Sequence, residues 1–137
     1  MELKIIIDTN LLVACMFNKN SASSEIINLA EKGMVDVMWH QKIRDEAKLI
    51  TGKISNAVPN AKIDINKVFK EQNEVKDVPN VENVSDDPED NKFLACAIAA
   101  SADMIVSNDA HLLDLKSFNG IPIYNSGQAL KVIRSGE

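Results

Sequence analysis

Short apolar runs alternate along the chain with longer stretches in which apolar residues recur every three or four positions. The runs Leu3–Ile7 and Met104–Val106 are continuous, which is typical of strands buried on both faces of a parallel sheet. Residues 34–39 alternate weakly between apolar and polar side chains and predict another strand. Ile121–Tyr124 predicts a short edge strand, because Pro122 has no backbone N–H to donate.

The segments between these strands predict helices. Apolar residues at helical spacing, together with start and stop signals, place helices at residues 11–16, 21–32, 41–51, 61–70, 88–100, 110–116 and 126–133. Residues 52–59 are expected to form a loop, and residues 72–85 a loop or a short edge strand. The alternation of strands and helices indicates one domain, residues 1–137, of the three-layer α/β class with a largely parallel sheet of four or five strands.

Acidic residues follow two of the buried strands. Asp8 comes directly after Leu3–Ile7, and Asp109 comes three positions after Met104–Val106. The carboxyl ends of central strands are the places where open α/β sheets bind ligands. Each acid could equally cap the helix that follows it, so position alone leaves both roles open.

The sequence Asp-Pro-Glu-Asp at residues 87–90 also allows two interpretations. Asp87 at the N-cap and a proline at the first helical position form a complete helix start, in which the acids could simply favour the helix dipole. Asp90, however, lies four and eight positions before Leu94 and Ile98, so it begins the helix face that packs against the sheet. That placement favours a buried role for Asp90.

The predicted helix at residues 41–51 separates two neighbouring acids. Its apolar stripe consists of Ile43, Ala47 and Ile50. Because each residue advances 100° around a helix axis, Glu46 falls at the edge of this stripe and can face a site above the sheet, whereas Asp45 points to the opposite side. An ordinary exposed glutamate is the alternative for Glu46.

Asp8, Glu46, Asp90 and Asp109 come from four elements but share one side of the predicted sheet. Neighbouring carboxylates repel one another unless positive charge is placed among them. Oxygen ligands without Cys or His favour Mg²⁺ or Mn²⁺, and such ions promote phosphodiester hydrolysis. The four acids therefore predict a metal-dependent phosphodiester hydrolase.

Composition adds three constraints. The net charge of −5 argues against a purely electrostatic grip on nucleic acid, although residues 40–70 hold seven basic residues against three acidic ones. Cys15 and Cys96 lie in apolar runs, which indicates buried reduced thiols, and His40 and His111 are isolated in the sequence. We find no apolar stretch of about eighteen residues and no cleavable leader, so we expect a cytoplasmic protein without a membrane segment.

Four features together resemble a PIN domain over nearly the whole chain. They are Asp8-Thr9-Asn10 after an apolar strand, Glu46 on the helix after the second strand, DPEDNKFLACA at residues 87–97 and ADMIVSNDAHLL at residues 102–113. The most similar branch is that of the VapC ribonucleases, which are toxin components of toxin–antitoxin pairs. The resemblance implies a Mg²⁺- or Mn²⁺-dependent endoribonuclease that acts on RNA, is often a homodimer, and is silenced by a cognate antitoxin protein.

The resemblance also implies roles for individual residues. It makes Asp8, Glu46, Asp90 and Asp109 the metal-binding and catalytic residues, Thr9, Asn10, Asp87, Asn91 and Ser107 their supports, and Lys42, Arg44 and Lys48 the contacts to RNA. Related toxins commonly have an Asp 18 positions before the final motif Asp, where this chain has Asn91. The third metal ligand therefore falls to Asp90 or to Asp87.

Two other interpretations use the same residues. A phosphatase of the haloacid dehalogenase type needs a second Asp two positions after the first, but Asn10 occupies that position. A PIN domain that has lost catalysis could bind RNA or protein without cutting it. The presence of all four acids favours the enzyme.

Overall fold

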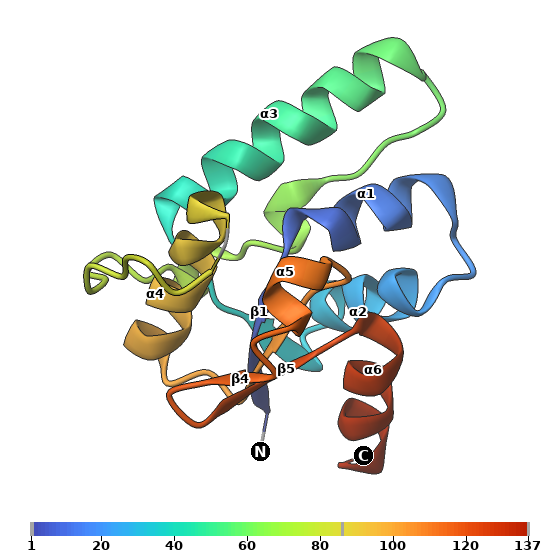
Figure 1. The fold of residues 1–137 in the computed structure, drawn as a ribbon. Helices are drawn as coiled ribbons and strands as arrows, with labels where there is room; N and C mark the ends of the chain where they lie inside the picture. Colours follow the sequence, from blue (N-terminus) through green and yellow to red (C-terminus); the bar gives the residue numbers. More distant parts are fainter. Residues whose placement is uncertain (1, 86, 137) are drawn as a thin grey trace.

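The computed structural model describes residues 2–85 and 87–136, which form a five-stranded sheet with helices on both sides (Figure 1). The strands are β1 (Leu3–Ile7), β2 (Val35–Val37), β3 (Met104–Val106), β4 (Ser117–Phe118) and β5 (Ile121–Tyr124). The helices are α1 (Thr9–Phe17), α2 (Ala22–Glu31), α3 (Gln41–Ala57), α4 (Asn91–Ala100), α5 (Ala110–Leu113) and α6 (Ser126–Ser135), with 3₁₀ turns η1 (Ile65–Lys67), η2 (Glu71–Asn73) and η3 (Pro88–Asp90). The predicted α/β fold is confirmed.

The sheet has the strand order β2-β1-β3-β5-β4. The first four strands in this order run parallel, with Ile5 of β1 opposite Met104 of β3 and Ile105 of β3 opposite Ile123 of β5. Only β4 runs antiparallel to its neighbour. Ile5 and Ile105 are fully buried, as expected of strands that are covered on both faces.

The ladder continues past the ends of β1 and β3, and this positions the site. The backbone N–H of Asp8 donates to the carbonyl of Val106 at 2.9 Å, and the N–H of Ser107 donates to the carbonyl of Tyr124 at 2.9 Å. The residues that follow two adjacent central strands are therefore held side by side.

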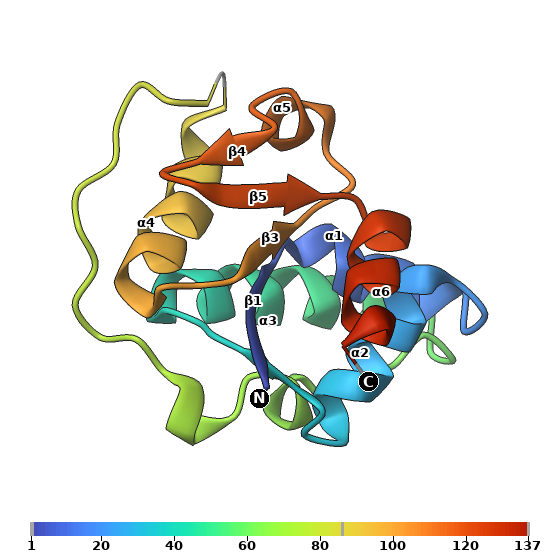
Figure 2. The same cartoon turned by 90° about the horizontal axis from the view of Figure 1, so that it is seen from below.

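Helices cover the sheet from both sides. Figure 2 shows α4 on one side of β1 and β3, and α2 and α6 on the other. The predicted burial of Cys15 and Cys96 is confirmed, and both are free thiols. In the described part of the chain, no helix is both long and apolar enough to cross a membrane.

Helix α3 is longer than expected. We expected residues 52–59 to be a loop, but the helix continues through Gly52 to Ala57. Nothing lies within 4 Å of a Cβ built at Gly52, and one glycine costs only about 1 kcal/mol in a helix, too little to end it here. The true stop signal is Pro59, directly after the C-cap Val58.

The helix predicted at residues 61–70 is wrong. The structure has only the short turns η1 and η2 in and after this region. Tertiary contacts fix the segment instead: Phe69 packs near Trp39, with ring centroids 6.1 Å apart, and the indole N–H of Trp39 donates to the carbonyl of Lys70 at 2.7 Å. Residues 72–85 are mainly a loop, with one parallel bridge between Glu74 and Trp39.

The edge position predicted for β5 is also wrong, because β4 pairs with its outer side. The two strands are joined by Asn119 and Gly120, whose φ angles of 51° and 78° are both positive. This is the geometry that two-residue hairpin loops prefer. α5 ends at Leu113 instead of reaching residue 116, where the backbone of Lys116 has a positive φ of 63° that a right-handed helix does not contain.

Candidate functional site

Asp8 and Asp109 are joined through one buried hydroxyl. Ser107 is fully buried, and its Oγ donates to Asp8 Oδ2 at 2.7 Å while accepting from the backbone N–H of Asp109 at 3.0 Å. Asp8 Oδ1 also accepts from the N–H of Asn10 at 3.3 Å, so Asp8 caps α1 as well. The two roles left open for Asp8 are thus compatible, because capping takes only one lone pair of one oxygen.

Asp90 is buried at the junction of η3 and α4. Only 4% of the residue is exposed, and its Oδ2 accepts from the hydroxyl of Ser85 at 2.9 Å. Asp87 caps η3 through the N–H of Glu89 at 3.0 Å, as the helix-start signal predicted. Pro88 accordingly begins a 3₁₀ turn, and the α-helix follows at Asn91.

Electrostatics indicates that the acids of different elements lie near one another. Burial raises the pKa of Asp8, opposed by the hydrogen bonds from Ser107 and Asn10, and the negative charges of Glu46 and Asp109 raise it further. Burial likewise raises the pKa of Asp90, opposed by Ser85, with further increases from Asp109, Asp87 and Asp8. Each buried carboxylate therefore experiences the charge of at least two other acids.

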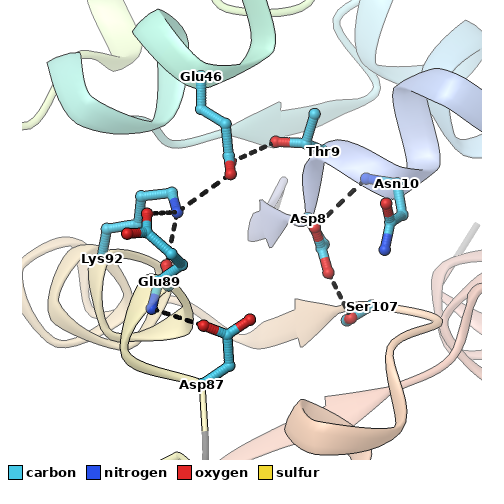
Figure 3. Close-up of polar contacts among 8 residues, drawn as sticks. All are labelled: Asp8, Thr9, Asn10, Glu46, Asp87, Glu89, Lys92 and Ser107. Carbon is cyan, nitrogen blue, oxygen red and sulfur yellow. Dashed lines mark hydrogen bonds and ion pairs between the residues drawn. The ribbon is translucent and has the colours of Figure 1, made fainter. Parts of the chain in front are cut away.

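Among the described residues, Glu46 is the one acid of the predicted quartet that pairs with a lysine or an arginine. Its Oε2 accepts from the hydroxyl of Thr9 at 2.7 Å, and its Oε1 lies 3.3 Å from Nζ of Lys92 (Figure 3). Thr9 thus supports Glu46, not Asp8. Figure 3 also shows Glu46, Asp8 and Asp87 pointing from different elements toward a common space.

Lys92 is a site residue that the sequence interpretation missed. Its side chain is only 10% exposed, and its Nζ also lies 3.6 Å from Oε2 of Glu89 and 4.7 Å from the ring centroid of Phe93. The 100° step places Lys92 on the side of α4 away from Asp90, so the sequence pattern alone gives it no place in the site. The contact with Glu46 arises only because α3 crosses at this point.

His111 was considered isolated, but the structure brings it to the acids. Its Nδ1 lies 3.5 Å from Asp109 Oδ1, which also accepts from the N–H of His111 at 3.1 Å. One possible ligand atom from each of Asp87, Asp90 and His111 lies within 4.8 Å of the other two. Within residues 2–85 and 87–136 this is the one trio of His, Cys, Asp or Glu side chains drawn so close, and the predicted quartet contributes only Asp90 to it.

A cavity of about 550 Å³ lies between the first turns of α3 and α4, and Glu46 is the member of the predicted quartet that lines it. Glu46 and Lys92 line it together with Lys42 and His40. The loop at residues 78–82 forms the opposite wall. The cavity therefore brings two lysines next to Glu46, among a lining that also holds Asp45, Glu82 and Glu89.

The other basic residues that were expected to contact RNA lie elsewhere on α3. Arg44 donates to Asn66 Oδ1 at 2.6 Å and lies 6.0 Å from the ring centroid of Trp39. Lys48 lines a separate surface with Leu49 and Gly52. Both residues are about 160° around the helix from Glu46, so only Lys42 shares its side.

The donor set fits a hard divalent cation. Asp8, Asp90 and Asp109 form no ion pair with Lys or Arg in the described part of the chain, and hydrogen bonds orient a carboxylate oxygen of each. Buried, oriented and uncompensated carboxylates are what Mg²⁺ or Mn²⁺ sites require. Asn91, an expected support, instead has a buried Oδ1 without a donor among the described residues.

The comparison with protein families identifies a match that includes the site. A family model described as PIN domain matches residues 4–111, which run from β1 to α5 and include all four predicted acids. The match extends over most of the 137 residues. No curated protein matches the chain.

Proposed function

The chain belongs to the PIN domain family, whose members are generally nucleases, and from this premise we propose that it is a Mg²⁺- or Mn²⁺-dependent endoribonuclease and the toxin of a toxin–antitoxin pair. The observation that carries the proposal is the pair of buried carboxylates, Asp8 and Asp90, that have raised pKa values and no basic partner in the described part of the chain. Buried carboxylates without a cationic partner destabilise a folded protein, and a bound divalent cation would remove this cost by neutralising their charge.

Four acids would hold the cation or cations. Asp8 and Asp109 offer oxygens at the strand ends, Asp90 offers one from the start of α4, and Glu46 approaches from α3. When bound, divalent ions at this position would offset phosphate charge and activate the water that attacks phosphorus. Ser107 keeps Asp8 in one orientation, and Thr9 does the same for Glu46.

Two lysines give the RNA a place beside the acids. Lys42 and Lys92 line the cavity next to Glu46. We expect both lysines to contact phosphate oxygens of the RNA there. The acidic overall charge of −5 makes a local contact of this kind necessary, because the chain as a whole repels RNA. We therefore assign RNA binding to Lys42 and Lys92, and not to Arg44 or Lys48.

One observation favours a second function, a PIN domain that binds RNA or protein without cutting. The ion pair between Lys92 and Glu46 already balances one of the four acids, so a cation has to compete with an ammonium group there. If that competition fails, the site keeps three acids and loses its fourth ligand. The chain would then act as a binding module.

The decisive experiment compares wild-type protein with the Asp8→Asn variant. Both proteins are stripped of metal and of any bound partner, then mixed with end-labelled single-stranded RNA and Mn²⁺ or Mg²⁺. We expect the wild type to cleave internally and the variant to be inactive, because an amide is a much weaker cation ligand. A wild type that binds RNA but never cleaves it would favour the binding module and refute the enzyme.

The toxin role and the partners need separate tests. Expression of the wild type should arrest cell growth, whereas Asp8→Asn should not. A small protein encoded beside the toxin gene should bind the chain and abolish cleavage. We also propose a homodimer, which light scattering after gel filtration checks through a molar mass of about twice 15.1 kDa.

A further inference from the structure

His111 brings an imidazole to the acidic site without being part of the four-acid pattern. The residue lies in the first turn of α5, where its backbone N–H donates a hydrogen bond to Asp109 Oδ1 and so fixes the backbone. Its side chain is 53% exposed, so the ring can turn without disturbing the core. An accessible imidazole beside several carboxylates is a mixed nitrogen and oxygen donor set.

The distances suit a single ion. Ligands bonded at about 2.1 Å to an octahedral cation stand about 3 Å apart when adjacent and about 4.2 Å apart when opposite. The donor atoms of Asp87, Asp90 and His111 all lie within 4.8 Å of one another. Small side-chain rotations would therefore complete this half of a coordination shell, with water in the remaining positions.

Two of the three side chains have donor capacity left. Asp90 uses Oδ2 for Ser85, and Asp87 uses Oδ1 for the N–H of Glu89. Neither acid forms an ion pair with Lys or Arg in the part of the chain that the structure describes. Both carboxylates can thus accept a cation and keep the hydrogen bonds that orient them.

We propose that Asp87, Asp90 and His111 form a second divalent-cation subsite in which His111 supplies an imidazole nitrogen. This inference rests on the proposed nuclease function and adds to it, because Asp90 connects the subsite to the acids around Asp8. Imidazole is a softer ligand than carboxylate and binds Mn²⁺ better than it binds Mg²⁺. The subsite therefore selects Mn²⁺ over Mg²⁺.

The chain offers a direct spectroscopic test because it has only two histidines, His40 and His111. Pulsed electron paramagnetic resonance of the Mn²⁺-loaded full chain detects nitrogen bonded to the metal, and ¹⁵N labelling of histidine alone identifies that nitrogen as imidazole. We expect the signal in the wild type and in His40→Asn, and its loss in His111→Asn. Asn preserves the cap that His40 provides for α3.

Binding affinities provide the second measurement. Removing His111 should weaken Mn²⁺ binding about tenfold or more while changing Mg²⁺ binding less, as judged by calorimetry. The His40→Asn control should leave both affinities unchanged. Selective labelling of the wild type does not depend on whether any variant folds, so the absence of a histidine nitrogen on Mn²⁺ overturns the proposal by itself, and the two variants assign a nitrogen that is observed to His111 or to His40.

The outcomes separate this subsite from the nuclease proposal. Wild-type protein that cleaves RNA with Mn²⁺ but shows no histidine nitrogen on the metal overturns the subsite and leaves the nuclease proposal standing. Protein that shows the nitrogen but never cuts RNA supports the subsite and refutes the nuclease. Persistence of the signal in His111→Asn also overturns the subsite.

Discussion

Replacing Ser107 with alanine tests the connection at the centre of the site. One buried hydroxyl donates to the carboxylate of Asp8 at 2.7 Å and accepts from the backbone of Asp109 at 3.0 Å. The variant removes both hydrogen bonds. The backbone N–H of Asp109 then loses its acceptor, and Oδ2 of Asp8 loses its hydroxyl donor. Solvent cannot replace these partners, because Ser107 is 0% exposed.

The expected loss of stability follows from these two bonds. A hydrogen bond to an ionised group contributes about 1.5–3 kcal/mol and a neutral one about 1 kcal/mol, so Ser107→Ala should lower the free energy of unfolding by about 3 kcal/mol. At about 2.1 cal/mol/K per residue, the unfolding entropy of the chain is about 0.29 kcal/mol/K, which converts the loss to a Tm lower by about 10 °C.

The variant should also weaken cation binding. The Ser107 hydroxyl holds the pKa of Asp8 below the value that burial alone would give, so its loss favours the protonated carboxyl and frees the side chain to rotate. Removing such a support typically weakens metal affinity about 10–100-fold. Urea and thermal unfolding without divalent ions measure the first effect, and the rise in Tm with added Mn²⁺ measures the second.

Ser24→Ala is the matched control. Ser24 is also buried, but its Oγ donates to the neutral carbonyl of Asn18 at 2.6 Å, between α1 and α2. This variant should lose about 1–2 kcal/mol and keep the full response to Mn²⁺. If Ser107→Ala unfolds like the wild type, or responds to Mn²⁺ as strongly, then Ser107 does not hold Asp8 in a cation site.

Three further predictions follow from burial and charge. Without divalent ions, Asp8→Asn should be more stable than the wild type at pH 7. Burial raises the pKa of Asp8, so the wild type loses free energy of unfolding as the pH rises from the ordinary pKa of 3.8 through the raised pKa of the folded state. Urea unfolding should therefore show that the difference between the two proteins disappears at low pH. Lys92→Met should weaken RNA binding and reduce the salt dependence of log K by about 0.7, whereas Lys48→Met should change neither in filter-binding assays. Burial raises the pKa of the Cys96 thiol to about 12, so mass spectrometry should find it unalkylated by iodoacetamide at pH 8 in the folded protein and modified after unfolding.

The strands and the acids that follow them were predictable because few folds can bury strands that are apolar on both faces. A run such as Leu3–Ile7 must be covered on both faces, which requires a parallel sheet between helix layers. Parallel strands then bring their carboxyl ends to one edge, so Asp8 and Asp109 had to lie near each other. The helical step separated Glu46 from Asp45 by their contacts. Both acids line the cavity beside Lys92, but only Glu46 accepts from Thr9 and pairs with Lys92, whereas Asp45 accepts from Gln41 of its own helix.

Other features needed tertiary information or were overlooked. The segment at residues 61–70 is held by Trp39, which is far away in sequence, so its local pattern could not reveal its structure. The β4–β5 hairpin did have a local signal in Asn119-Gly120, the pair that favours a two-residue turn with positive φ at both positions. Pro122 favoured an edge strand because it has no N–H to donate, yet β4 pairs with this segment and places Ser117 opposite Pro122.

The contact between Lys92 and Glu46 shows where interpretation of the acids alone was incomplete. Glu46 has an ammonium group 3.3 Å away, whereas Asp8 and Asp90 are more buried and have only hydroxyl or amide donors. We therefore expect a bound cation to be attracted most by Asp8 and Asp90 and to compete with Lys92 for Glu46, because like charges repel. We expect Lys92 to contact an RNA phosphate once a cation has displaced it from Glu46. The same ammonium group would then neutralise Glu46 before the cation binds and a phosphate of the substrate afterwards.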